Sequence, residues 1–246
     1  MHQEALLMNV PKCECYVYKL EIGNEFYVGF TSQKPEKRIE AHILSSENGA
    51  MQKINIALIG CGRISQKHIL AIISEYKRCE LVAICDNNEK QIEKISDFYE
   101  SQLKKSNFPL KHLIKFNTYD ELIKAKLNNK IDIDLIVLAT PSGLHPMQTK
   151  IAANSGINVC TEKPMALNLA DAQEMVKVCK EAKVKLFVIK QNRLNPTLQI
   201  LKKKVEENKF GNIGIVDINV FWQRPQSYYD QDDWRGTKDL DGGALL

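Results

Sequence analysis

Two glycines, Gly60 and Gly62, follow an apolar run from Ile54 to Ile59 in which only Asn55 is polar. Such a run is typical of a parallel strand that is covered on both faces. Gly60 permits a tight turn after the strand, and Gly62 lets the backbone approach a group that a side chain would block. A helix that begins directly after such a turn presents unpaired N–H groups and the positive end of its dipole. This arrangement predicts a binding site for a pyrophosphate.

The residues after the glycines extend this site. Arg63 and Ile64 follow Gly62 directly, and we expect both to contact the bound cofactor. Ser65 replaces the third glycine of the usual pattern, but serine is small enough for close packing of the helix on the strand. The substitution therefore weakens the pattern without removing it.

An acidic residue ends the next apolar segment. This segment runs from Cys79 to Asp86, which stands 24 positions after Gly62. An acidic side chain at this place accepts hydrogen bonds from the adenosine ribose and repels the additional phosphate of NADP. The structural alternative is a turn or cap role, because Asn87 and Asn88 also suit a turn. Together with the glycine turn, Asp86 predicts NAD as the cofactor rather than NADP.

A polar cluster, ATPSGLHP, follows a later apolar segment. Open α/β sheets bind their ligands at the carboxyl ends of the strands, where this cluster should lie. We expect Thr140, Pro141 and Ser142 to line the nicotinamide side of the cleft. His145 either contacts the ligand there or bonds locally to the backbone at a helix N-terminus.

A second cluster, CTEKPMAL, contains Glu162 and Lys163 at the end of a buried strand. Hydride transfer from a secondary alcohol to NAD requires a group that accepts the hydroxyl proton. Partial burial and the positive nicotinamide would lower the pKa of Lys163 toward neutrality, so Lys163 is the predicted base. Glu162 would pair with Lys163 or hold the nicotinamide ribose. A solvated Glu–Lys pair is the structural alternative.

The composition excludes several classes of protein. The chain has 246 residues, of which 44% are hydrophobic and 26% charged, and its net charge of +4 is interspersed along the sequence. These values do not indicate a nucleic acid or a membrane as a partner. Apolar runs such as Ile133 to Ala139 are too short to span a bilayer, and the N-terminus lacks a signal-peptide pattern. We expect a cytoplasmic protein.

The cysteines predict neither disulfides nor a metal site. Their number is odd, and most fall within expected strands and helices, which is typical of reduced core residues. Cys13 and Cys15 lack a second pair or suitably spaced histidines, so no zinc site is expected. The seven cysteines are Cys13, Cys15, Cys61, Cys79, Cys85, Cys160 and Cys179.

Strands and helices alternate from Ile54 onward, which predicts right-handed crossovers and a doubly wound parallel sheet. We assign residues 53–190 to this α/β dinucleotide-binding domain of Rossmann type. The expected strands are 54–60, 79–86, 113–117, 133–140, 158–162 and 185–191. The expected helices are 89–102, 145–155 and 169–182, with two more that begin near 63 and near 119, the latter capped by Thr118.

Residues 191–246 have a different character. A basic amphipathic helix from Pro196 to about Asn208 precedes a turn at Gly211 to Gly214 and an alternating strand from Ile215 to Trp222. We expect these residues to open a second α/β domain with an open mixed sheet. This domain is expected to be incomplete, because the final DGGALL carries no turn or cap signal.

Residues 1–50 form a separate piece. Tyr16 to Tyr18, Tyr27 to Gly29, Arg38 and His42 resemble the opening half of a GIY-YIG endonuclease domain, which implies two short strands and a helix. Such nucleases need a metal-binding glutamate from a later helix, beyond this segment. The favoured alternative is a hairpin whose tyrosines pack a small core.

The motifs GCGRIS, the acidic end of the second strand, ATPSGLHP and EKP resemble, in order and spacing, those of the Gfo/Idh/MocA oxidoreductases. The resemblance covers about Lys53 to Leu246 and implies a Rossmann domain followed by an α/β domain. It gives Lys163 the catalytic or substrate-positioning role, and a homo-oligomer is expected at full length. The family's usual histidine after a glycine-rich stretch like Asp241 to Ala244 would lie beyond this chain, which puts its turnover in doubt.

Two segments, KQNRLNP and residues 221–244, resemble the sugar-nucleotide branch of that family. The branch oxidises the 3-hydroxyl of UDP-N-acetyl-D-glucosaminuronate in the synthesis of bacterial surface polysaccharide, such as the O-antigen of lipopolysaccharide. We expect Asn192, Arg193 and Arg235 to bind this substrate together with Lys163.

The side chains of these segments agree with an anionic sugar. Arg193, Arg224 and Arg235 suit forked contacts to a carboxylate or diphosphate, and aromatic side chains suit stacking on sugar or uracil. The aromatic residues are Tyr228, Tyr229 and Trp234. Ordinary surface and loop roles are the structural alternative. Other functions left open are a non-catalytic NAD-binding protein, another sugar or inositol dehydrogenase of the family, and a nuclease.

Overall fold

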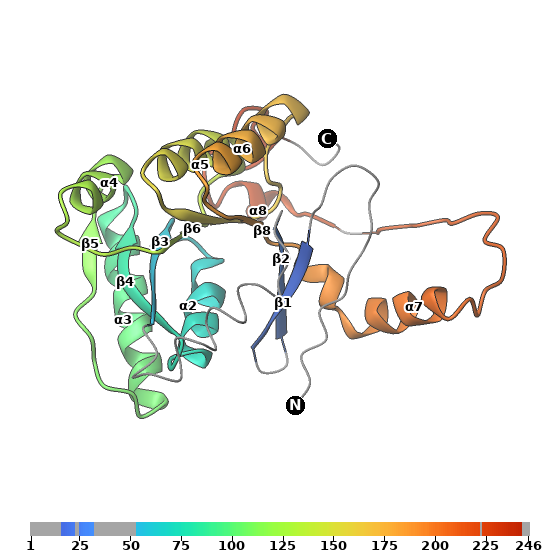
Figure 1. The fold of residues 1–246 in the computed structure, drawn as a ribbon, viewed down its shortest axis with the longest axis horizontal. Helices are drawn as coiled ribbons and strands as arrows, with labels where there is room; N and C mark the ends of the chain where they lie inside the picture. The colour runs from blue at the N-terminus through green and yellow to red at the C-terminus, as the bar shows by residue number, and fades with distance from the viewer. Residues whose placement is uncertain (1–15, 23–24, 32–52, 222, 243–246) are drawn as a thin grey trace.

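The computed structural model describes residues 16–22, 25–31, 53–221 and 223–242, which form two separate sheets (Figure 1). The larger sheet has six parallel strands in the order β5-β4-β3-β6-β7-β8. Because the chain winds outward from β3 in both directions, the predicted doubly wound Rossmann fold is confirmed. Its strands are β3 (Ile54–Ile59), β4 (Cys79–Cys85), β5 (Ile114–Phe116), β6 (Leu135–Leu138), β7 (Asn158–Thr161) and β8 (Leu186–Val188).

Helices cover both faces of this sheet. An apolar core under α2 and α3 contains Leu58, Leu81 and Tyr99, and a second core under α4 and α5 contains Ile136 and Ala152. The helices are α2 (Ser65–Ser74), α3 (Glu89–Lys105), α4 (Tyr119–Leu127), α5 (His145–Asn154) and α6 (Leu169–Glu181). Alternate strand residues thus face opposite cores, as a sheet buried on both faces requires.

Local sequence signals explain where several helices begin. Thr118 caps α4 as predicted, in a capping box with Glu121. The helix expected from about residue 63 begins at Ser65, because Gly62 to Ile64 form the turn itself. The strand expected at 133–140 is shortened to β6, since only residues 135–138 pair with both neighbouring strands.

The expected strand at residues 215–221 is wrong. These residues form no ladder, and Ile215 and Phe221 are 90% and 96% exposed. Alternation of apolar residues makes a strand only where a neighbour accepts its hydrogen bonds, and the described residues offer none here. Trp222 lies outside the described residues. The helix α7 (Pro196–Glu206) is confirmed, and a short α8 spans Gln226–Tyr229.

The front of the chain forms an antiparallel hairpin of β1 (Tyr16–Ile22) and β2 (Glu25–Thr31), so the two predicted strands are confirmed. Strand β2 lies against β8 and the 3₁₀ turn η2 (Gln191–Leu194). The expected helix, Arg38, His42, Cys13 and Cys15 lie outside the described residues. Among the residues that the structure describes, no helix has both the length and the apolarity needed to cross a bilayer.

Candidate functional site

The glycine turn lies at the centre of the sheet, where the strand order reverses. Gly60 has φ of +93°, and a Cβ placed on it would come within 2.6 Å of the Ala139 carbonyl oxygen. Its N–H donates to the Cys85 carbonyl at 2.8 Å. A residue with a side chain would therefore be strained and would collide with the chain leaving β6, so Gly60 is required for the turn itself.

Gly62 has a different role. A Cβ on Gly62 would meet nothing within 4 Å, so the space above its backbone is open. Arg63 and Ile64 are exposed beside it, and Ser65 is fully buried, as close packing of helix on strand requires. An open glycine at the N-terminus of α2 fits a dinucleotide pyrophosphate.

Asp86 joins the second strand to the glycine turn. Its Oδ2 accepts the N–H of Cys61 at 2.7 Å, and its Oδ1 accepts the N–H of Asn88 at 2.9 Å. The turn role considered as an alternative is therefore present, and a contact between Asp86 and a ribose stays a prediction. Burial, with the charge of Asp86, raises the pKa of the Cys61 thiol to about 12, so this cysteine is an unreactive part of the turn.

The predicted polar cluster after β6 forms the 3₁₀ turn η1 (Ser142–Leu144) next to the glycine turn. The Thr140 hydroxyl donates to the Gln148 side chain at 2.6 Å. The fully buried His145 places Nε2 at 3.0 Å from the Thr140 carbonyl and Nδ1 at 2.9 Å from the Pro164 carbonyl. This is the geometry of the backbone-bonding alternative, and contact between His145 and a ligand stays a prediction.

Glu162 and Lys163 differ sharply in exposure. Glu162 is 8% exposed, whereas Lys163 is exposed and lines a cavity. Partial burial of Lys163 was expected, and this is wrong because the residue lies two positions beyond the end of β7, in a turn that leaves its side chain exposed. The Glu162 Oε2 accepts the N–H of Lys163 at 3.2 Å, and its Oε1 lies 3.1 Å from His68 Nε2.

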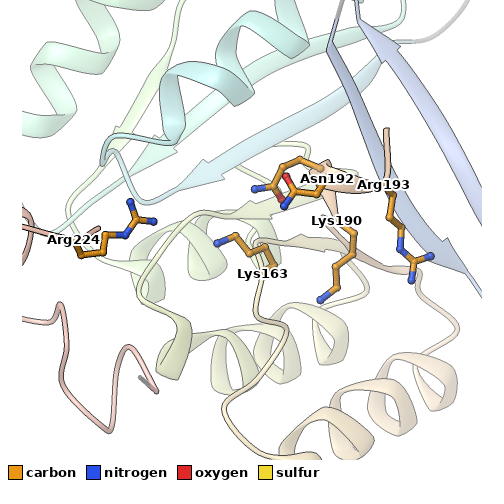
Figure 2. A pocket seen from close by; sticks show the side chains of 6 residues that line it. Lys163, Lys190, Asn192, Arg193 and Arg224 are labelled. Carbon is orange, nitrogen blue, oxygen red and sulfur yellow. The ribbon is translucent and has the colours of Figure 1, made fainter. Parts of the chain in front are cut away.

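The cavity beside Lys163 has a volume of about 310 Å³. Figure 2 shows Lys163 between Arg224 on one side and Lys190 and Asn192 on the other. Four of the lining side chains are cationic and none is acidic. Such a lining stabilises an anion that carries more than one negative charge. The lining residues are Lys163, Lys190, Gln191, Asn192, Arg193 and Arg224.

The structure brings two of the three predicted substrate residues to this cavity and leaves the third outside its lining. Asn192 and Arg193 line it, whereas Arg235 pairs with Asp232 at 2.7 Å and lies 4.7 Å from the Tyr228 ring. Lys190 and Gln191 were not predicted, although they begin the same KQNRLNP segment. The expected strand at 185–191 included both residues, whereas β8 ends at Val188 and leaves them beyond its carboxyl end, where open α/β sheets bind ligands.

The glycine turn, the acidic end of β4 and the doubly wound sheet define a dinucleotide-binding α/β protein. Residues 54–190 match the family GFO_IDH_MocA, described as an oxidoreductase family with an NAD-binding Rossmann fold, and the chain belongs to this family. NAD is thus its cofactor class. The match does not include residues 1–50, so it lends no support to the nuclease hypothesis.

Two solved structures are similar to this chain. The WlbA dehydrogenase from Bordetella pertussis, in complex with NADH and UDP-GlcNAcA, is 44% identical with a TM-score of 0.67 over 79% of this chain and 54% of that chain. The WlbA dehydrogenase from Chromobacterium violaceum, in complex with the same two compounds, is 40% identical with a TM-score of 0.66 over 79% of this chain and 51% of that chain.

Curated relatives are more distant. The D-apiose dehydrogenase of Paraburkholderia graminis is 26% identical over 182 residues, which are 74% of this chain and 42% of the relative. The inositol 2-dehydrogenase of Rhizobium meliloti is 26% identical over 165 residues, which are 67% of this chain and 44% of the relative. The chain thus spans about half the length of the proteins it matches.

Proposed function

We propose that this protein takes part in the NAD-dependent oxidation of a hydroxyl group on an anionic UDP-sugar. The proposed substrate is UDP-N-acetyl-D-glucosaminuronate, oxidised at its 3-hydroxyl in a cytoplasmic pathway to bacterial surface polysaccharide. The cavity carries this proposal, because Lys163 stands there among three further cations and no lining carboxylate. A sugar with both a carboxylate and a diphosphate would balance that charge. The 44% identity to WlbA supports the same substrate class.

The residues of the glycine turn suit the cofactor. The open backbone at Gly62 and the N-terminus of α2 would hold the pyrophosphate, and Asp86 would accept the adenosine ribose hydroxyls. Thr140, Pro141 and Ser142 would line the nicotinamide side. When bound there, NAD supplies the hydride acceptor.

Lys163 and its neighbours supply the rest of the reaction. In its neutral form, the Lys163 Nζ takes the proton of the substrate hydroxyl as the C–H bond gives up its hydride, so that an alcohol becomes a ketone. Arg193 and Arg224, on opposite sides of Lys163, would hold the anionic groups of the substrate (Figure 2). Asn192 would orient the sugar by hydrogen bonds.

The substitution Lys163→Met tests this role directly. We expect turnover to fall by about 100-fold or more, the scale for loss of a general base, with NAD affinity retained. Turnover is followed by NADH absorbance and by the mass of the sugar product, and NAD affinity by calorimetry. A 2-oxo acid is added as a hydride acceptor, so that NADH that stays bound does not hide the reaction.

The control is Lys180→Met, which removes an exposed lysine of α6 outside the cavity lining. It should leave turnover unchanged. Equal turnover in Lys163→Met and the control would remove Lys163 from the mechanism. Binding of NAD without turnover on any UDP-sugar would favour the alternative of a non-catalytic NAD-binding protein.

A second candidate substrate class is a free sugar or an inositol, as the names of the curated relatives suggest. The same assay therefore includes D-apiose and myo-inositol beside the UDP-sugars. A neutral polyol brings no negative charge to the four cationic side chains of the cavity, so we expect UDP-N-acetyl-D-glucosaminuronate to be preferred. Preference for a neutral polyol would overturn the anionic-substrate proposal.

A further inference from the structure

His68 is a buried polar residue to which the reaction proposed above gives no role. It lies on α2, three residues after Ser65, and is 5% exposed. Its Nε2 lies 3.1 Å from Oε1 of Glu162, with side-chain exposures of 6% and 11%. This is a close polar contact between an imidazole nitrogen and a carboxylate oxygen.

Glu162 also bonds to the backbone of Lys163, its neighbour in sequence. Its second carboxylate oxygen accepts the N–H of Lys163, and its own N–H donates to the Leu138 carbonyl at 2.9 Å. Burial by itself raises the pKa of Glu162, but His68, the Lys163 N–H and the Lys163 charge outweigh it and hold the pKa below its usual value. Glu162 is therefore an ionised carboxylate. One of its oxygens contacts His68 on α2, and the other accepts the backbone N–H of Lys163.

A buried carboxylate needs such partners. Removal of a polar partner leaves the charge of a buried carboxylate without compensation, so that side chain turns toward water or changes its protonation. If Glu162 turned outward, the Lys163 N–H would lose its acceptor. On the other side, His145 holds the Pro164 carbonyl at 2.9 Å, so the turn keeps one anchor when His68 is removed.

We propose that His68 is a positioning residue for Lys163, acting through the Glu162 carboxylate. The contact joins the helix that begins at the dinucleotide turn to the turn that carries the proposed base. His68 thereby fixes the Lys163 backbone relative to the place where the cofactor binds. The expected effect of His68 on turnover rests on the proposed function. The expected effect of His68 on the Lys163 backbone does not depend on any substrate.

The test compares His68→Leu, His68→Gln and His112→Leu. Leucine removes the ring nitrogen, glutamine keeps an N–H donor at a similar reach, and His112 is an exposed histidine outside the site. Amide hydrogen exchange of the peptide that contains residues 160–166 is measured by mass spectrometry in all three variants. We expect His68→Leu to speed exchange at Lys163 by about tenfold, because local opening becomes less costly. His68→Gln and His112→Leu should match the unmodified protein.

NADH affinity and turnover complete the test. His68→Leu should lower kcat by about tenfold, since a small misplacement of a reacting group is costly, and should leave NADH affinity and KM unchanged. His68→Gln should restore kcat. Should the protein turn over no substrate at all, the proposed function fails, while the exchange measurement still decides this inference.

Two outcomes would overturn the inference. One is that His68→Leu changes neither amide exchange at Lys163 nor kcat. The other is that His68→Leu and His68→Gln speed exchange and lower kcat equally, which would indicate that the shape of the histidine side chain matters rather than its polar contact. If His68→Leu does not fold, Glu162→Gln takes its place. It keeps the shape of the side chain but removes the charge that His68 faces, so it must also speed exchange at Lys163.

Discussion

At the scale of single residues, the two glycines of the dinucleotide turn have separable roles. Gly60 has a left-handed backbone and a carbonyl 2.6 Å from where its Cβ would be. Gly62 has neither feature and faces open space. The first glycine therefore serves the fold, whereas the second is predicted to serve the approach of a ligand.

Alanine at each position should separate these roles. Gly60→Ala should lower the free energy of unfolding by at least about 2 kcal/mol, from the positive φ and the collision with Ala139. Gly62→Ala should keep the melting temperature of the cofactor-free protein but weaken NADH binding by about tenfold or more, because a Cβ enters the pyrophosphate space. Calorimetry measures both quantities. A loss of stability in Gly62→Ala equal to that in Gly60→Ala would contradict the assignment.

Asp86 combines a structural bond with a predicted effect on cofactor choice. Asp86→Asn keeps an oxygen for the Cys61 N–H but removes the negative charge. The affinity for NADP relative to NAD should rise by about tenfold, because the 2′-phosphate is no longer repelled. Asp86→Ala should relax the preference as well and should also destabilise the turn. Titration of each variant with both cofactors checks this, and an unchanged preference in both would refute the role of Asp86.

The sequence could predict where residues lie when the signal is local. Gly60, Asp86 and Lys163 lie beyond the carboxyl ends of their strands as expected, because that position depends only on neighbours in the chain. Their contacts with cofactor or substrate stay predictions. The contact of His68 with Glu162 joins residues far apart in sequence, so no periodicity could show it. Lys163 exposure was misjudged because burial depends on the surrounding turns.

At the scale of elements, His145 at the start of α5 joins two turns. One ring nitrogen faces the Thr140 carbonyl after β6, and the other faces the Pro164 carbonyl after β7. Two carbonyls can both be satisfied only by the protonated ring, because a neutral imidazole has a single N–H. Burial opposes that charge more strongly and sets the net direction, so the pKa of His145 lies below its usual value.

The lowered pKa predicts a direction for the pH dependence of stability. The unfolded chain binds the His145 proton at a higher pH than the folded protein does, so the folded state loses stability as the pH falls below about 6.5. The free energy of unfolding should decrease by no more than about 1.4 kcal/mol per pH unit from this group. Urea unfolding at pH 7, 6 and 5 measures it.

The substitution His145→Asn should reduce this pH dependence, since the titrating group is gone. His112→Asn, at an exposed position, serves as the control and should retain the dependence. An identical slope in His145→Asn and the unmodified protein would show that another group is responsible.

Strand prediction shows the same limit at this scale. Residues 54–59 and 79–85 form strands as expected, because they are mostly apolar and lie within a sheet that continues on both sides. Residues 215–221 have the alternation of a strand but no partner among the described residues, and their side chains are exposed. Alternating apolar residues indicate that a segment is able to pair as a strand, whereas the pairing itself depends on a neighbouring strand elsewhere in the molecule.

At the scale of the whole molecule, residues 228–240 contact both the glycine turn and the turn η1. The Tyr228 ring lies 5.8 Å from the Arg63 guanidinium, at the dinucleotide turn. The Gly143 N–H donates to the Leu240 carbonyl at 3.0 Å, at the turn η1. Residues 228–240 therefore contact the two turns between which we expect the cofactor to bind, and their position depends on both turns.

Gly143 controls the second of these contacts. A Cβ on Gly143 would lie 2.0 Å from the Asp239 carbonyl oxygen and 3.0 Å from the Leu240 Cα, both of which are backbone atoms. Because backbone cannot rotate away as a side chain can, Gly143→Ala should displace residues 237–242 from η1. Trypsin cleavage after Lys238 should then become faster by about tenfold, in proportion to the local opening.

The matched control is Gly214→Ala, where a Cβ meets nothing within 4 Å. Cleavage after Lys238 should be the same in this variant as in the unmodified protein, and mass spectrometry of the products reports the site in each case. If NADH binding requires the contacts of residues 237–242, NADH should slow trypsin cleavage after Lys238, because a ligand stabilises the contacts that its bound state requires. Equal cleavage rates in Gly143→Ala and Gly214→Ala would mean that the Gly143–Leu240 contact does not hold this segment in place.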